Sequence, residues 1–222
     1  VLVVVLLPVF LLSSSSAVLY LYKRQFVGYL SLNIAISPGY ITTVSPSAGI
    51  ALAALLIWGN RLWPGIFLGS TLLNVLIGLQ QNPLTFSEIS IALVVATGAT
   101  LQALLGAYLI RRYIDFPIAL AEEKEIFLFM LLAGPVSCIV SATAGISILY
   151  LTHAIALSEL VSSWSTWWVG DITGVLITAP LCFIAFAQPR QLWISRKTVV
   201  TIPLVFMLTS VIALYVWTSK LE

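Results

Sequence analysis

Residues 161–186 have the sequence VSSWSTWWVGDITGVLITAPLCFIAF. The stretch is mostly apolar and exceeds the roughly 20 residues that a helix needs to cross a bilayer. Its single charged side chain is Asp171, ten residues from the start. A carboxylate at membrane depth is costly unless it is paired, hydrated or used to cap a helix. The stretch therefore predicts a membrane helix with a candidate functional site at Asp171.

The composition of the whole chain supports this interpretation. Its 222 residues are 60% hydrophobic and 8% charged, with a mean hydropathy of +1.09. Soluble domains carry about 25% charged residues, so this chain is predicted to be a polytopic membrane protein with the lipid bilayer as its surroundings. The net charge of +2 argues against nucleic acid as a partner. Cys138 and Cys182 lack metal-ligand spacing, and no motif predicts a cofactor, a metal or catalysis.

Eight apolar segments predict an all-α bundle of about eight helices in a single domain, 1–219. Leu221 and Glu222 are compatible with a cloning remnant. Two segments, 26–37 and 46–58, reach only about 20 Å of a ~30 Å hydrocarbon core. They are either a re-entrant hairpin or two tilted helices, joined by a linker rich in Pro, Gly and hydroxyls. The eight segments are 1–22, 26–37, 46–58, 63–79, 89–110, 126–151, 161–186 and 199–217.

The basic residues predict the orientation of the chain. Nine of the ten Lys and Arg residues fall in the connections after the first, third, fifth and seventh segments. The positive-inside rule places those connections in the cytoplasm and both ends of the chain outside. Trp164, Trp167 and Trp168, near the predicted outer edge, are expected as interfacial anchors.

Small residues at helical spacing predict close contacts between helices, because lipid supplies no hydrophobic drive for association. Gln102 lies in the middle of one such stripe, and its buried amide needs partners in the bundle interior. Pro135 and Pro180 fall inside predicted helices and are expected to kink them. The predicted packing residues are Gly65, Gly69, Gly98, Gly106, Ser137, Ser141 and Gly145.

Two alternatives remain open for Asp171. In one, Gly170 breaks the helix and Asp171 caps the half that follows. In the other, Asp171 faces a cavity and binds a cation, a proton or a polar ligand, and broken half-helices are known to build such sites. The predicted ligand-binding set is Asp171, Gly170, Gly174, Trp167, Trp168, Ser45, Pro46, Ser47, Gly49, Asn74 and Gln102.

Three phrases together resemble the MASE1 family of bacterial integral-membrane sensory domains. They are SPSAGIALA at 45–53, WPGIFLGS at 63–70 and WWVGDITG at 167–174, the last followed by Ala179-Pro180. The resemblance covers about residues 29–186. One departure is that the family usually has Trp-Pro-Pro where this chain has Ser45-Pro46-Ser47, so contacts made by that Trp and second Pro cannot be carried over.

The resemblance implies an input module without catalysis of its own, in a histidine kinase or diguanylate cyclase that dimerises through the parent protein. A periplasmic CHASE-type sensor often follows such domains. The stimulus is expected to be a small ligand, an ion or another membrane protein. The alternatives are a small-molecule carrier or substrate-binding membrane subunit, suggested by the short Pro/Gly-interrupted segments, and a scaffold that only docks a partner.

Overall fold

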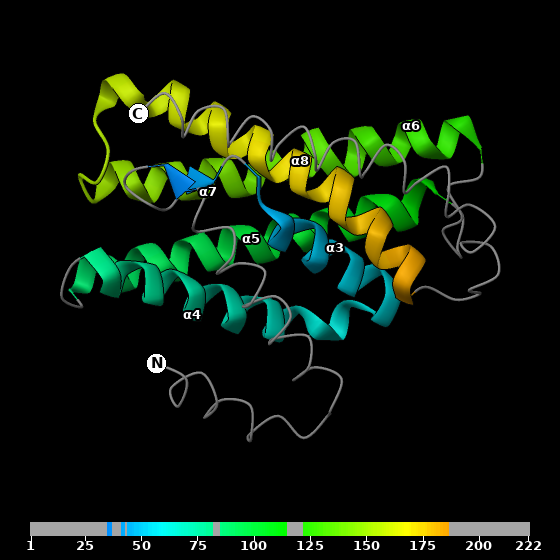
Figure 1. Ribbon diagram of the computed structural model, residues 1–222, viewed down its shortest axis with the longest axis horizontal. Coiled ribbons are helices and arrows are strands. Elements are labelled where there is room, and N and C mark those ends of the chain that lie inside the picture. The colour runs from blue at the N-terminus through cyan, green and yellow to red at the C-terminus, as the bar shows by residue number, and fades with distance from the viewer. Residues whose placement is uncertain (1–34, 37–40, 43, 82–84, 115–121, 187–222) are drawn as a thin grey trace, which may run out of the picture.

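The computed structural model is a bundle of long helices around one short central helix (Figure 1). It describes residues 35–36, 41–42, 44–81, 85–114 and 122–186. The helices are α3 (Pro46–Trp58), α4 (Trp63–Gln81), α5 (Phe86–Tyr113), α6 (Glu123–Leu131), α7 (Ser137–Leu151) and α8 (Leu160–Phe186). The π-helical turn η3 (Leu132–Val136) joins α6 to α7, and the short 3-10 turns η2 (Asn60–Leu62) and η4 (Leu157–Glu159) precede α4 and α8.

The described part confirms an all-helical membrane fold. Four helical stretches are long and apolar enough to cross a membrane: Asn60–Leu79, Phe86–Tyr113, Glu123–Leu151 and Leu157–Ile184. Their bounds follow the predicted apolar segments closely. The predicted segments 1–22 and 199–217 and most of 26–37 lie outside the described residues, so the count of eight stays a prediction. A two-residue antiparallel pairing, β1 (Ala35–Ile36) with β2 (Ile41–Thr42), precedes α3.

Helix α3 fills the centre of the bundle. Its Ala- and Leu-rich sequence favours a helix, Pro46 occupies the first turn, and Gly59 ends it with a positive φ of 92°. Eight consecutive residues from Gly49 to Leu56 are buried. A helix that is apolar all round must be enclosed by others. At about 1.5 Å per residue α3 is roughly 20 Å long, so it covers only part of the length of the bundle.

The N-terminus of α3 contacts the middle of α8, with the two backbones in direct contact. The Ser45 N–H donates a 3.0 Å hydrogen bond to the Gly170 carbonyl, which is already inside a helix. A Cβ built on Gly174 would overlap the Ser45 carbonyl, and one built on Gly49 would lie 2.5 Å from the Gly174 oxygen. Glycine is therefore required on both helices at this crossing.

We expect Gly174→Ala to destabilise the domain, because the added methyl group meets backbone that cannot turn away. Overpacking of this kind costs on the order of 2–3 kcal/mol. Gly65→Ala is the matched control, since a Cβ there meets no described atom within 4 Å and alanine favours a helix. Unfolding free energies from SDS titration of the two variants check this. Equal stability of Gly174→Ala and the unmodified protein would contradict it.

Arg111 secures the other end of α3. Its guanidinium donates to the Leu55 carbonyl near the C-terminus of α3 and to the Asn60 Oδ1 at 2.6 Å. The positive charge also suits the negative end of the helix dipole. Helix α3 is therefore held at its start by α8 and at its end by α5.

Replacing Arg111 with Gln is expected to loosen the α3–α4 junction, because a shorter neutral amide cannot reach both acceptors. Amide hydrogen exchange at residues 56–62 should become about tenfold faster or more, the equivalent of losing roughly 1.4 kcal/mol of local protection. The control Arg112→Gln removes the same charge from the next residue. Equal exchange in both variants would show that charge alone matters.

Helix α5 packs against α7 on one side and α4 on another. A Cβ on Gly98 would lie 2.8 Å from the Ala144 Cβ, and one on Gly106 would meet Leu52 and Ser137. The same interface includes Ser137 and Ser141 of α7. Ser141 and Gly145 also face Trp167 of α8. A Cβ on Gly65 would meet no described atom within 4 Å, whereas Gly69 is buried on α4.

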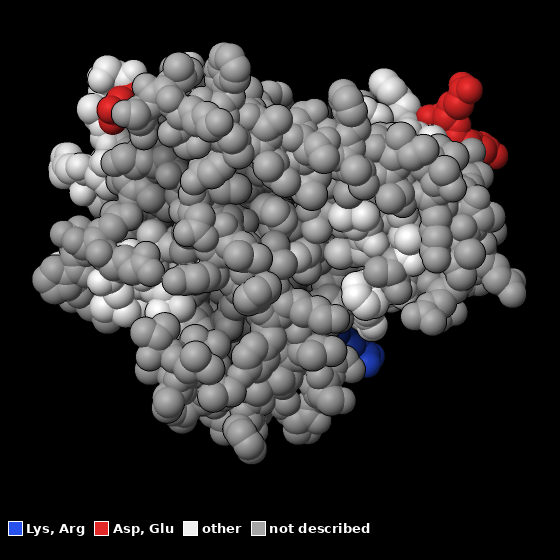
Figure 2. All heavy atoms as spheres, viewed as in Figure 1, with Lys and Arg blue, Asp and Glu red and all other residues white. Residues whose placement is uncertain are grey.

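The described basic residues gather at one end of the bundle. Arg61 lies in the α3–α4 connection beside Asn60, which Arg111 contacts, while Arg112 ends α5 and Lys124 begins α6. In the view of Figure 2 the visible basic atoms lie on the right, toward the end where α3 and α8 terminate. This grouping is what the predicted orientation requires, and the side of the membrane stays a prediction.

Candidate functional site

Asp171 is the only charged residue among the buried residues of the described part, with 4% of its surface exposed. It lies on α8 directly after Gly170, which accepts the hydrogen bond from Ser45. Gly170 does not break α8, because the helix continues from Leu160 to Phe186. The expectation that Asp171 caps a new half-helix is therefore wrong. The helix that begins at this depth is α3, on a different part of the chain.

Polar side chains from α5 and α7 gather around Cys138, near enough to Asp171 for its charge to act there. The carboxylate interacts electrostatically with the Cys138 thiol, and the Gln102 amide donates to the Cys138 Sγ at 3.2 Å. Ser137 lies beside Cys138 and donates a 2.6 Å hydrogen bond to the Ala133 carbonyl. We call Gln102, Ser137, Cys138 and Asp171 the polar core. It joins three helices at a depth where apolar side chains dominate.

The chemistry of the polar core follows from its donors and acceptors. An ionised Asp171 only accepts hydrogen bonds, whereas its protonated form also donates one. The Gln102 amide and the Ser137 hydroxyl can each donate and accept hydrogen bonds, and the Cys138 thiol is a weak donor and a weak acceptor. Because burying an unpaired charge is expensive, gain or loss of a proton or cation at Asp171 changes the energy of the whole cluster.

The α3 N-terminus borders the polar core. Ser45, Pro46 and Gly49 meet α8 at Gly170 and Gly174, on either side of Asp171. The hydroxyls of Ser45 and Ser47 lie 3.3 Å apart. Two of the sequence phrases, 45–53 and 167–174, are far apart in the chain and form one contact in the structure.

The chain matches the MASE1 family model over residues 3–220. It belongs to the MASE1 family. MASE1 domains are membrane-associated sensory domains and are not catalytic. Comparison with curated proteins and with solved structures finds no match. The family assignment and the four apolar spans together make this chain a membrane protein with a sensory role.

Three indole N–H groups of this MASE1 domain connect α8 to the preceding span. Trp164 donates to Thr143 at 3.2 Å, Trp167 to Ser141 at 3.2 Å and Trp168 to the Pro135 carbonyl at 2.9 Å. The Trp167 ring is buried against Gly145, where a Cβ would lie 2.5 Å from the ring. Trp167 is thus part of the interior and not the interfacial anchor that its position in the sequence predicts.

Asn74 is not brought to the polar core. It is buried on α4, which packs against α5, and its amide donates to the Ser70 carbonyl of its own helix at 2.8 Å. Conversely, the sequence predicted no polar role for Cys138, whose Sγ accepts the hydrogen bond from Gln102. The signal lay in its position next to Ser137 on the small-residue stripe.

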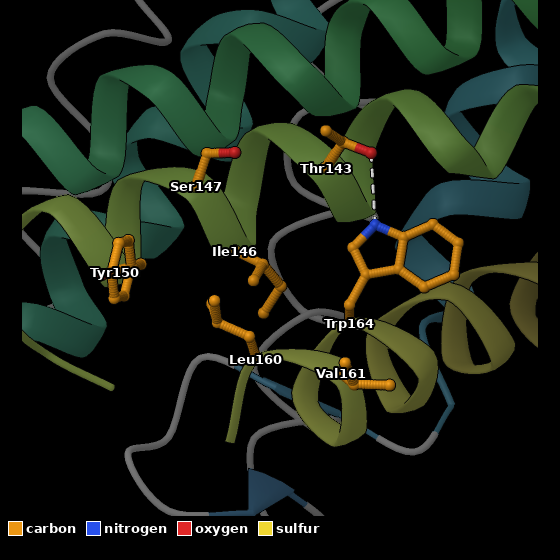
Figure 3. A pocket seen from close by; sticks show the side chains of 7 residues that line it. All are labelled: Thr143, Ile146, Ser147, Tyr150, Leu160, Val161 and Trp164. Atoms are coloured by element: carbon orange, nitrogen blue, oxygen red, sulfur yellow. Dashed lines mark hydrogen bonds between the residues drawn. The ribbon is translucent and has the colours of Figure 1, made fainter. Parts of the chain in front are cut away.

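A groove of about 350 Å³ opens between α7 and α8 toward the η4 end (Figure 3). Its walls are mainly apolar, and the Trp164–Thr143 hydrogen bond closes one side. The groove is separate from the polar core, since none of its lining residues belongs to that cluster. The lining residues are Thr143, Ile146, Ser147, Tyr150, Leu160, Val161 and Trp164.

We expect Gly145→Ala and Trp167→Phe to be non-additive. The added methyl group collides with distal atoms of the six-membered indole ring, which phenylalanine lacks. Gly145→Ala alone should cost about 1–3 kcal/mol, and much less in the Trp167→Phe background. A double-mutant cycle on unfolding free energy measures the difference. Strict additivity would show that the two residues do not share this contact.

Proposed function

We propose that this MASE1 domain is the membrane-embedded input module of a bacterial signalling protein of the histidine kinase or diguanylate cyclase type. Its polar core is the site that perceives the stimulus. The observation that supports this most directly is the buried carboxylate of Asp171, placed between two backbone contacts of α3 with α8. Ionisable groups inside a membrane domain are costly and mark functional sites.

The mechanism is a shift between two packings of the bundle. A stimulus acts only through its difference in affinity for the two states, and a near-complete switch needs about 5.5 kcal/mol of such difference. The close contact between α3 and α8 at Gly49 and Gly174 leaves no free space, so movement of α8 at Asp171 must also move α3. The small-residue interface between α5 and α7 supports small sliding movements.

The proposed orientation places the end of the bundle that holds the basic residues on the cytoplasmic side of the inner membrane. Arg61, Arg111, Arg112 and Lys124 support it by sharing one end of the bundle. The groove between α7 and α8 then lies toward the extracytoplasmic side. The polar core is about midway between the two ends of α8.

Asp171→Asn in the full-length receptor is expected to change the set point of signalling without unfolding the domain, because the amide keeps the shape and removes the charge. A lost hydrogen bond to a charged group is worth about 1.5–3 kcal/mol, or roughly 10- to 150-fold in the balance of states. Kinase or cyclase output is measured in proteoliposomes across a series of pH values and added cations. The change in output caused by Asp171→Ala should be at least as large as that caused by Asp171→Asn.

Glu123→Gln is the matched control, because it removes one carboxylate at an exposed position at the start of α6. Thermal unfolding of all three variants separates a loss of fold from a loss of signal. If Asp171→Asn folds normally and its output matches that of the unmodified receptor under every condition, the polar core is not the sensing site.

A further inference from the structure

The span from Glu123 to Leu151 contains a built-in interruption. Its middle, Leu132–Val136, is a π-helical turn that includes Pro135. Proline has no N–H, and its ring collides with the carbonyl four residues earlier, so an ordinary α-helix cannot pass through it undisturbed. A π-turn accommodates one extra residue, and such turns occur frequently at functional sites.

Side chains donate hydrogen bonds to two carbonyls of this turn. Ser137 donates to the Ala133 carbonyl at 2.6 Å from within the same span. Trp168 of α8 donates to the Pro135 carbonyl at 2.9 Å, and its ring stacks on Trp164 with centroids 5.5 Å apart. In a membrane interior no water competes for these two carbonyls, so each of these bonds matters more than it would on a surface.

The two halves of the span are held differently. Helix α7 packs closely along α5, at Gly98 and Ala144. In α6, Phe129 is the one buried residue, and its ring meets Phe183 edge-on with centroids 6.0 Å apart. Most of the other apolar side chains of α6 are exposed in the described structure, including Phe127 and Met130. Helix α6 is therefore attached through the π-turn, the Phe129–Phe183 contact and the half-buried Leu128.

We propose that the π-turn Leu132–Val136 is a hinge and that the Trp168–Pro135 hydrogen bond is its latch. With the latch formed, α6 is held against α8 through Phe129. With the latch broken, α6 reorients about the turn and its charged N-terminus moves relative to α3 and α4. Trp168 lies three residues before Asp171, and Ser137 and Cys138 directly follow the turn, so the hinge adjoins the polar core.

Spin labels test the hinge in the full-length protein in lipid nanodiscs. The labels are attached to p-acetylphenylalanine at exposed positions 61 and 124, which leaves both native cysteines in place. Trp168→Phe keeps an aromatic ring and removes the donor. A swing of about 20° of a nine-residue helix moves its far end by on the order of 5 Å. We expect the 61–124 distance distribution to shift or broaden by that amount.

Trp164→Phe is the matched control, because it disturbs the same ring stack and removes an indole bond that goes to Thr143 instead of the turn. It should leave the distribution unchanged. Pro135→Ala restores the missing N–H and lets the helix become regular, so it should also shift the 61–124 distance. If Trp168→Phe does not fold, the result for Pro135→Ala decides the test. The proposal is overturned if the 61–124 distance distribution of Trp168→Phe, or of Pro135→Ala where Trp168→Phe does not fold, matches that of the unmodified protein. An equal shift in Trp164→Phe also overturns it.

The role of the hinge in signalling rests on the proposed function, whereas its existence does not. The distance measurement needs no stimulus, so it remains informative if Asp171 proves irrelevant to output. If the distances do not move while Asp171→Asn alters output, the hinge is rejected and the sensing site is retained.

Discussion

The backbone contact between Ser45 and α8 at Gly170 and Gly174 determines how the rest of the domain is arranged. Helix α3 is too short to cross a membrane and too uniformly apolar to lie at its surface. In lipid there is no hydrophobic drive to hold it in place, so van der Waals contact and hydrogen bonds must do so. The two glycines permit the approach, and Arg111 fixes the opposite end. Asp171 lies where it does because it is bracketed by those glycines.

Around this contact the polar core, the tryptophans and the π-turn form one connected system. Asp171 lies near enough to Cys138, just after the π-turn, for its charge to act there, and Trp168 donates to a carbonyl within that turn. Packed interiors tend to have discrete arrangements and do not deform smoothly. In the proposed mechanism, a change of charge at Asp171 acts on α3 through backbone contact and on α6 through the turn. Such a layout suits a domain that must convert a local event into a difference between two packings.

Much of the fold could be predicted because hydrophobic length and helical spacing are properties of single segments. The bounds of α3 match the predicted segment, and Ser137, Ser141 and Gly145 do face neighbouring helices. What a periodic pattern cannot specify is which helix will be the neighbour. Asn74 looked equivalent to Gln102 in the sequence, yet α4 packs on the far side and Asn74 bonds to its own helix. Trp167 likewise turned inward because Gly145 opened a space for its ring.

The short central helix also constrains how the protein is made. Ribosomes deliver α3 to the membrane well before Arg111, Gly170 and Gly174 have been synthesised, and 13 residues are too few to be inserted as a stable span. The contacts of α3 with Gly170 and Gly174 can therefore form only after α8 has been synthesised. Until then the face of α3 that meets α8 lacks its protein neighbour, which is the kind of feature that membrane chaperones and proteases survey.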